Sequence, residues 1–186
     1  MGKIRLTGGE NKRQSLRIPK GIRPTRAIVK RSMFDTLRDF VVNADVLEIF
    51  AGSGAVGFEA LSRGASSCVF IEKSREGMLT IIENAKKLGV LDRIRVIKAD
   101  FVRGLNDLIR EQKKFDLIFA DPPYDFLNHD ELFKRIVSLL KSGGLYLVEV
   151  RNKTQLPEIW ENLSKVKEVN FGQTKVVYYR MLSGDL

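Results

Sequence analysis

Short apolar runs alternate with longer amphipathic segments along most of the 186-residue chain. Apolar residues dominate both faces of the short runs, which is typical of buried strands in a parallel sheet. The expected strands cover residues 46–50, 68–71, 94–97, 117–120 and 145–150. Strands that alternate with helices form βαβ units, so the pattern predicts a doubly wound α/β fold with helices on both faces of a mostly parallel sheet.

Helical periodicity fills the intervals between these strands. The first expected helix covers residues 26–40, and Thr25 stands immediately before it as a plausible N-cap. Further helices are expected over residues 77–88, 130–140 and 155–163. The helix over 130–140 would have His129 at its first turn, and the helix over 155–163 would bury Trp160.

The end of the chain departs from this alternation. Two strand-like runs, residues 166–170 and 175–181, are separated by only four residues, which leaves no room for a helix. They are therefore expected to form an antiparallel hairpin at one side of the sheet, which would then have seven strands.

Length and composition indicate one globular domain of ordinary apolar content, 44%. No apolar run approaches a membrane span, and no hydrophobic segment follows the charged N-terminus as in a signal peptide. Cys68 is the single cysteine, expected in the core, and His129 the single histidine. These counts argue against disulfides, Cys/His zinc sites and Ser-His-Asp catalysis, and they favour a cytoplasmic protein without a bound metal. We also expect the protein to be a monomer.

Charge is concentrated at the N-terminus. Residues 1–31 hold ten lysines and arginines against one acid, Glu10, and so carry the whole net charge of +9. Apolar residues alternate around Gly8-Gly9, which favours a basic β-hairpin over residues 1–25 preceding the main domain, 26–186, although a solvated tail is the alternative. Positive charge this concentrated suggests an arm that binds a polyanion such as nucleic acid. The expected contacts are Arg5, Lys12, Arg13, Arg17, Arg23 and Arg26.

A glycine-rich loop follows the first expected strand. The stretch from Glu48 to Gly57 contains the pattern G-x-G-x-x-G, in which glycines let the backbone turn sharply and approach a ligand. Glu72 ends the second strand, where an acid can hold both ribose hydroxyls, and Asp100-Phe101 ends the third. Polar groups at three successive strand ends converge on one crevice, which predicts an adenosine-containing ligand.

A second motif, Asp121-Pro122-Pro123-Tyr124, ends the fourth expected strand. The prolines hold the loop extended and remove two backbone donors, so a carboxylate, the Pro122 carbonyl and an aromatic ring remain. Two acceptors match the two N–H groups of an exocyclic base amine, and the ring of Tyr124 can stack on the base. Asp121, Pro122 and Tyr124 are therefore the candidate catalytic residues, and the base must leave its stack to reach them.

Together with residues 59–65 and the upstream Arg23-Pro24-Thr25, these motifs resemble the RsmD family over essentially the whole chain. The resemblance implies a Rossmann-like class I methyltransferase that uses S-adenosylmethionine to methylate the N2 amine of a guanine in small-subunit ribosomal RNA. The substrate would be that RNA or an assembling ribosomal particle. The implied cofactor-binding residues are Thr25, Glu48, Phe50, Ala51, Gly52, Gly54, Glu72, Lys73, Asp100, Phe101 and Asp121.

The sequence departs from the family pattern at two positions. Glu48 stands where members often carry Asp, and Ser74 stands where a second acid is frequent, so ribose recognition rests mainly on Glu72. Three other functions fit parts of the sequence. An adenine-N6 methyltransferase acting on DNA or RNA could use the same tetrapeptide, but the DNA enzymes usually carry a target-recognition domain. Glutamine-N5 methyltransferases begin the motif with Asn, and a non-catalytic RNA-binding assembly factor would not need Asp121.

Overall fold

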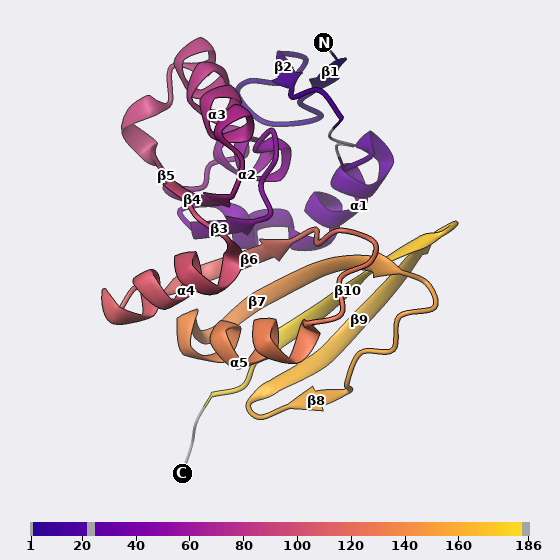
Figure 1. Ribbon diagram of the computed structural model, residues 1–186. Coiled ribbons are helices and arrows are strands. Elements are labelled where there is room, and N and C mark those ends of the chain that lie inside the picture. The colour runs from indigo at the N-terminus through magenta and orange to yellow at the C-terminus, as the bar shows by residue number, and fades with distance from the viewer. Residues whose placement is uncertain (1, 22–24, 184–186) are drawn as a thin grey trace.

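The computed structural model describes residues 2–21 and 25–183, which form a two-stranded and an eight-stranded sheet (Figure 1). The larger sheet has the strand order β5-β4-β3-β6-β7-β10-β9-β8, parallel from β5 to β7 and antiparallel beyond. Its strands are β3 (Asp45–Ile49), β4 (Ser67–Glu72), β5 (Ile94–Lys98), β6 (Phe115–Ala120), β7 (Leu140–Arg151), β8 (Ile159–Trp160), β9 (Leu163–Phe171) and β10 (Thr174–Met181). The α/β fold with a mostly parallel sheet and a final hairpin is confirmed.

Helices cover both faces of this sheet. They are α1 (Ala27–Leu37), α2 (Ala55–Ser62), α3 (Arg75–Leu88), α4 (Phe101–Arg110) and α5 (His129–Leu139), with 3-10 turns η1 (Arg38–Val41) and η2 (Leu91–Arg93). Successive residues of β3 alternate between two cores. Val46 packs with apolar residues of α1, α2 and α3, and Leu47 packs with those of α4 and α5. This alternation explains why the parallel strands are apolar on both faces.

The expected N-cap of the first helix is wrong. Arg26, not Thr25, occupies that position, and no side chain caps the helix. The hydroxyl of Thr25 instead donates to Asp121 Oδ2 at 3.3 Å, so this residue faces the interior and not the helix end. By contrast, Ser74 caps α3 by accepting the Gly77 N–H at 2.9 Å, and His129 begins α5 as expected.

The expected helix over residues 155–163 is also wrong. The segment contains no helix: Ile159–Trp160 form the eighth strand, β8, which pairs with β9 after a turn at residues 161–162. The Tyr179 hydroxyl donates to the Pro157 carbonyl at 2.6 Å, and the Trp160 ring packs 5.6 Å from that of Phe133. Packing against the sheet edge therefore outweighs the helical spacing of a segment that contains a proline.

The N-terminal hairpin, β1 (Gly2–Arg5) and β2 (Ser15–Ile18), lies beside α2 and α3 (Figure 1). Its apolar residues Ile4, Leu6, Leu16 and Ile18 belong to the same core as α1, α2 and α3. On the α3 side, Asn84 accepts the Arg17 N–H at 2.8 Å and donates back to the Arg17 carbonyl at 3.0 Å. The hairpin thus packs on the domain as part of its hydrophobic core.

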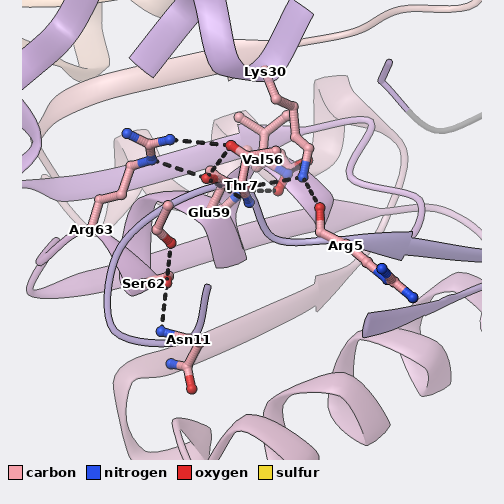
Figure 2. Close-up of polar contacts among 11 residues, drawn as sticks. Arg5, Thr7, Asn11, Lys30, Val56, Glu59, Ser62 and Arg63 are labelled. Atoms are coloured by element: carbon pink, nitrogen blue, oxygen red, sulfur yellow. Dashed lines mark hydrogen bonds and ion pairs between the residues drawn. The ribbon is translucent and has the colours of Figure 1, made fainter. Parts of the chain in front are cut away.

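A buried ion cluster fastens the hairpin on its other side (Figure 2). The Lys30 ammonium of α1 lies 3.1 Å from Glu59 of α2, and both side chains are 0% exposed. Glu59 also accepts the Thr7 N–H at 2.9 Å and the Arg63 Nε–H at 2.9 Å, while Lys30 donates to the Arg5 carbonyl at 3.2 Å. Burial lowers the pKa of Lys30 against the opposing effect of Glu59. Burial raises the pKa of Glu59, but Lys30, Thr7 and Arg63 outweigh it and the net shift is downward.

Candidate active site

The carboxyl ends of the parallel strands border a cavity of about 570 Å³, a size usual for small-molecule sites. Nearly all the residues that the sequence assigned to cofactor or catalysis line it. They are Thr25, Glu48, Phe50, Ala51, Gly52, Glu72, Lys73, Asp100, Phe101, Asp121, Pro122 and Tyr124. Gly54 does not line the cavity; it is the N-cap of α2 at φ 73°, and a Cβ there would lie 2.8 Å from Phe58 Cε2.

The glycine-rich loop turns sharply after β3. Gly52 has φ 55°, and Phe50 has φ 60°, a conformation uncommon for a residue with a side chain. The Glu72 carboxylate holds this loop to β4, because it accepts the Gly52 N–H at 2.8 Å with one oxygen and the Ser74 N–H at 2.8 Å with the other. A carboxylate has about four acceptor positions, so Glu72 can also take hydroxyl donors from the cavity.

Glu48 lies under the loop and is 6% exposed. It accepts N–H groups from the first turn of α2, Gly57 at 2.7 Å and Val56 at 3.4 Å. Burial raises the pKa of Glu48 to about 8, with a further rise from the nearby charge of Asp121 and opposition from the two N–H groups. The carboxyl is therefore largely protonated at neutral pH, which limits the negative charge that accumulates beside Asp121.

Three phenylalanines form an aromatic cluster at the cavity wall. The ring centroids of Phe50, Phe101 and Phe126 lie 5.3–5.5 Å apart in pairs. Their faces offer an apolar site for a flat heterocycle next to Asp100, which also caps α4 by accepting the Arg103 N–H at 3.1 Å. Phe126 was missed from the sequence, although it is the next aromatic residue after Tyr124.

Asp121 follows the last residue of β6 and faces the same cavity as the glycine-rich loop. Thr25 donates to it from the segment before α1. Tyr124 is 44% exposed at the cavity mouth, and the Arg151 guanidinium stacks on its ring at 4.9 Å. This end of the cavity combines a carboxylate, two consecutive prolines and a partly exposed aromatic side chain.

His129 does not line the cavity and packs edge-on against Phe126 at 5.0 Å. Burial lowers its pKa. Within residues 2–21 and 25–183, no group of three or more His, Cys, Asp or Glu side chains is arranged to hold a metal ion. In the same part of the chain, no helix combines the length and apolar character needed to cross a lipid bilayer.

The candidate RNA-binding residues occupy different environments. Arg5, Lys12, Arg13 and Arg17 are all exposed on the hairpin, and the Arg17 guanidinium forms an ion pair with Glu83 of α3 at 2.5 Å. Arg26 lines the cavity and donates to the Phe171 carbonyl and to Thr174 Oγ1, so it is separate from the hairpin group. Arg23 lies outside the described residues.

Glu149 lines the cavity and was missed from the sequence. It belongs to β7, one residue beyond the Ala120–Val148 pair of the β6–β7 register, and so lies beside Asp121. Its only sequence signal is one acid within an otherwise apolar strand, Leu145 to Val150. An acid in that setting is costly to bury without a partner. That cost is the sequence signal from which Glu149 could have been predicted as a site residue.

The strand order and the cavity at the carboxyl ends of the strands define a Rossmann-like class I methyltransferase fold. Residues 4–180 match the family model described as Conserved hypothetical protein 95. The chain is 31% identical to ribosomal RNA small subunit methyltransferase D of Escherichia coli K12, over 99% of this chain and 93% of that one. It therefore belongs to the RsmD family.

Solved structures agree with this assignment. A candidate methyltransferase of Escherichia coli, yhhF, superposes with a TM-score of 0.88 at 31% identity and covers 97% of this chain and 99% of its own. A hypothetical protein of Thermus thermophilus superposes with a TM-score of 0.81 at 27% identity, covering 94% of this chain and 98% of its own. Both likenesses extend over nearly the whole fold.

Proposed function

We propose that this protein transfers a methyl group from S-adenosylmethionine to the exocyclic N2 amine of a guanine in small-subunit ribosomal RNA. The observation that carries the proposal is the shared cavity: the glycine-rich loop and the Asp121-Pro122-Pro123-Tyr124 segment both line one space of about 570 Å³. The small-subunit methyltransferase D of Escherichia coli, 31% identical, supports ribosomal RNA as the substrate.

The residues present fit S-adenosylmethionine. Glu72 has acceptor positions for ribose hydroxyls, the phenylalanine cluster with Asp100 suits an adenine ring, and the loop from Phe50 to Gly52 leaves room for a close backbone approach. When bound, S-adenosylmethionine supplies an electrophilic methyl group on a sulfonium. No metal is needed for such a transfer, so the protein contributes mainly by positioning the two reactants.

Asp121 and the Pro122 carbonyl would each accept a hydrogen bond from one N–H group of the target amine. The nitrogen lone pair of a base amine is delocalised into the ring, which makes it a poor nucleophile. Two acceptors placed on its hydrogens favour a pyramidal nitrogen whose lone pair points toward the methyl group. Thr25, from the segment before α1, donates a hydrogen bond to the Asp121 carboxylate, and Tyr124 would stack on the base after it leaves its helix.

The exposed basic residues of the hairpin, Arg5, Lys12 and Arg13, would hold the RNA backbone. The hairpin packs into the domain core, so these charges are presented from a fixed position. The partner would be the ribosomal RNA, free or in an assembling particle, and we expect the protein to act as a cytoplasmic monomer.

Asp121→Ala tests the proposal, with Asp121→Asn as the conservative variant. The substrate is ribosomal RNA or small-subunit particles from a strain that lacks the enzyme, and mass spectrometry identifies the methylated nucleoside. Both variants should lose at least about 100-fold in single-turnover rate, because an acceptor that acts in the transition state is removed. S-adenosylmethionine affinity, measured by calorimetry, should stay within a few-fold.

Three results would contradict the proposal. A near-normal rate in Asp121→Ala would remove the carboxylate from the reaction. N6-methyladenine as the wild-type product would identify an adenine methyltransferase. Binding of RNA without methylation by the wild type would identify a non-catalytic assembly factor.

A further inference from the structure

Glu149 lies beside Asp121 in the cavity lining, where it provides a second carboxylate next to the target base. In the parallel β6–β7 pair the last partners are Ala120 and Val148, so Asp121, which directly follows β6, comes next to Glu149 of β7. Adjacent strands are about 4.8 Å apart and paired residues share a face, so the two carboxylates point the same way. Both line the cavity, and both also line the small recess beneath it that reaches Thr25.

The Glu149 side chain is held in place from the β10 side. Thr174, which is 2% exposed, donates its hydroxyl to Glu149 Oε1 at 2.9 Å. Arg26 donates to Thr174 Oγ1 at 3.3 Å and also to the Phe171 carbonyl. A buried hydroxyl fixed by a guanidinium therefore orients the carboxylate, so that reorienting it would break a chain of hydrogen bonds.

The edge of guanine that carries the target amine has three donors in a row: two N–H groups on N2 and the N–H on N1. Asp121 and the Pro122 carbonyl account for the first two in the proposed function. The oxygens of a carboxylate accept hydrogen bonds, so Glu149 beside Asp121 suits the third donor. Adenine differs at this point, because the atom next to its exocyclic amine is N1 with a lone pair, which a carboxylate repels.

We infer that Glu149 selects guanine over adenine by accepting a hydrogen bond from the N1–H group, with Thr174 as its positioning residue. The inference rests on the proposed N2 methylation and adds the residue that sets base specificity. A site that hydrogen-bonds a substrate donor rejects analogues without that donor, because its own polar group is then left unpaired.

The test compares two target bases in one synthetic RNA. Mass spectrometry first locates the nucleotide that the wild-type protein methylates, and the RNA is then made with guanine or 2-aminopurine at that site. 2-Aminopurine keeps the amine on C2 but has a lone pair in place of the N1 hydrogen. It also lacks O6, but that difference affects wild type and variants alike and cancels when their preferences are compared.

Wild type should prefer guanine by at least about 10- to 100-fold in kcat/KM, the range for one charge-assisted hydrogen bond. Glu149→Gln should lose a similar factor on guanine and reduce the preference to a few-fold, because the amide can donate to N1. Glu158→Gln is the matched control: it removes the same charge from a side chain that is 77% exposed and should change neither value. S-adenosylmethionine affinity should be unchanged in both variants.

Thr174→Val and Thr174→Ser provide a second, independent test in case Glu149→Gln does not fold. Valine removes the hydroxyl that orients Glu149 and should reduce the guanine preference, and serine should restore it. If the wild type makes N2-methylguanosine but Glu149→Gln keeps the full preference for guanine, the inference is overturned and the proposed function stands. A methylated adenine from the wild type would overturn both.

Discussion

Replacing Lys30 by methionine removes the cation from the buried ion cluster under the N-terminal hairpin. The Glu59 carboxylate, 0% exposed, would keep its bonds to Thr7 and Arg63 but lose the ammonium at 3.1 Å. The Arg5 carbonyl would lose a donor as well. Methionine has a similar length and no polar atom that needs a partner, so it isolates the loss of the charge.

The expected cost follows from the geometry of the cluster. Removing one partner of a buried ion pair typically costs about 3–5 kcal/mol, because the other charge is left uncompensated. Arg63 remains 2.9 Å from Glu59, so we expect the lower end, about 3 kcal/mol in the free energy of unfolding. With a urea dependence of about 2 kcal/mol per molar, the unfolding midpoint would fall by about 1.5 M.

Urea unfolding of Lys30→Met measures this change directly. Arg110→Met is the matched control, because Arg110 pairs with Asp107 on α4 but is 78% exposed, and exposed pairs contribute little. In Lys30→Met, hydrogen exchange should accelerate over residues 2–18 more than over β3, since Lys30 connects the hairpin to two helices. A midpoint shift below about 0.5 M, or exchange that is unchanged in the hairpin, would refute the role of the cluster as its anchor.

Three further outcomes are expected. Glu72→Ala should raise the dissociation constant of S-adenosylmethionine by roughly 10- to 100-fold in calorimetry, as for a charge-assisted bond, and an unchanged constant would place the ribose elsewhere. Because the pKa of Glu48 rises from 4.5 in the unfolded chain to about 8 in the folded protein, its proton favours folding at low pH. The wild-type free energy of unfolding, measured in urea, should therefore fall relative to Glu48→Gln as pH rises from 4.5 to about 8; a constant difference would contradict the shift. Lys12→Glu combined with Arg13→Glu should weaken RNA binding and flatten its salt dependence without changing cofactor affinity; an unaltered salt slope would remove the hairpin from the RNA surface.

The parallel sheet could be predicted because each of its strands is buried on both faces. The apolar run of Val46 to Ile49 has no polar face except Glu48, and the structure places it between two helical layers. The final hairpin could be predicted from the length of the connection alone, since four residues between two strands cannot hold a helix. These features depend on local sequence and can therefore be predicted without knowledge of the structure.

The errors arise where a distant partner decides the local structure. Thr25 suits an N-cap by residue type, but its hydroxyl donates a hydrogen bond to Asp121, a residue 96 positions away. The segment around Trp160 has helical spacing, but β9 and Phe133 hold it as an edge strand. Propensity is a weak preference that a few tertiary contacts outweigh.

Glu149 shows the same limit at the candidate site. The sequence places it within a strand, but its position beside Asp121 depends on the register between β6 and β7. A shift of one residue would turn the side chain to the opposite face of the sheet. The acids that could be predicted, Glu72, Asp100 and Asp121, lie at strand ends, where the fold class alone fixes their location.

The hairpin is made first but can dock only late during synthesis. Its contacts to Glu59 and Asn84 span 52 and 67 residues of sequence, so neither partner exists when β1 and β2 leave the ribosome. Leu16, completely buried in the finished protein, stays exposed until α3 has been made. Contacts between distant residues slow folding and prolong the exposure of apolar surface. The nascent chain should therefore be most prone to aggregation, and most dependent on chaperones, before residue 88 has emerged.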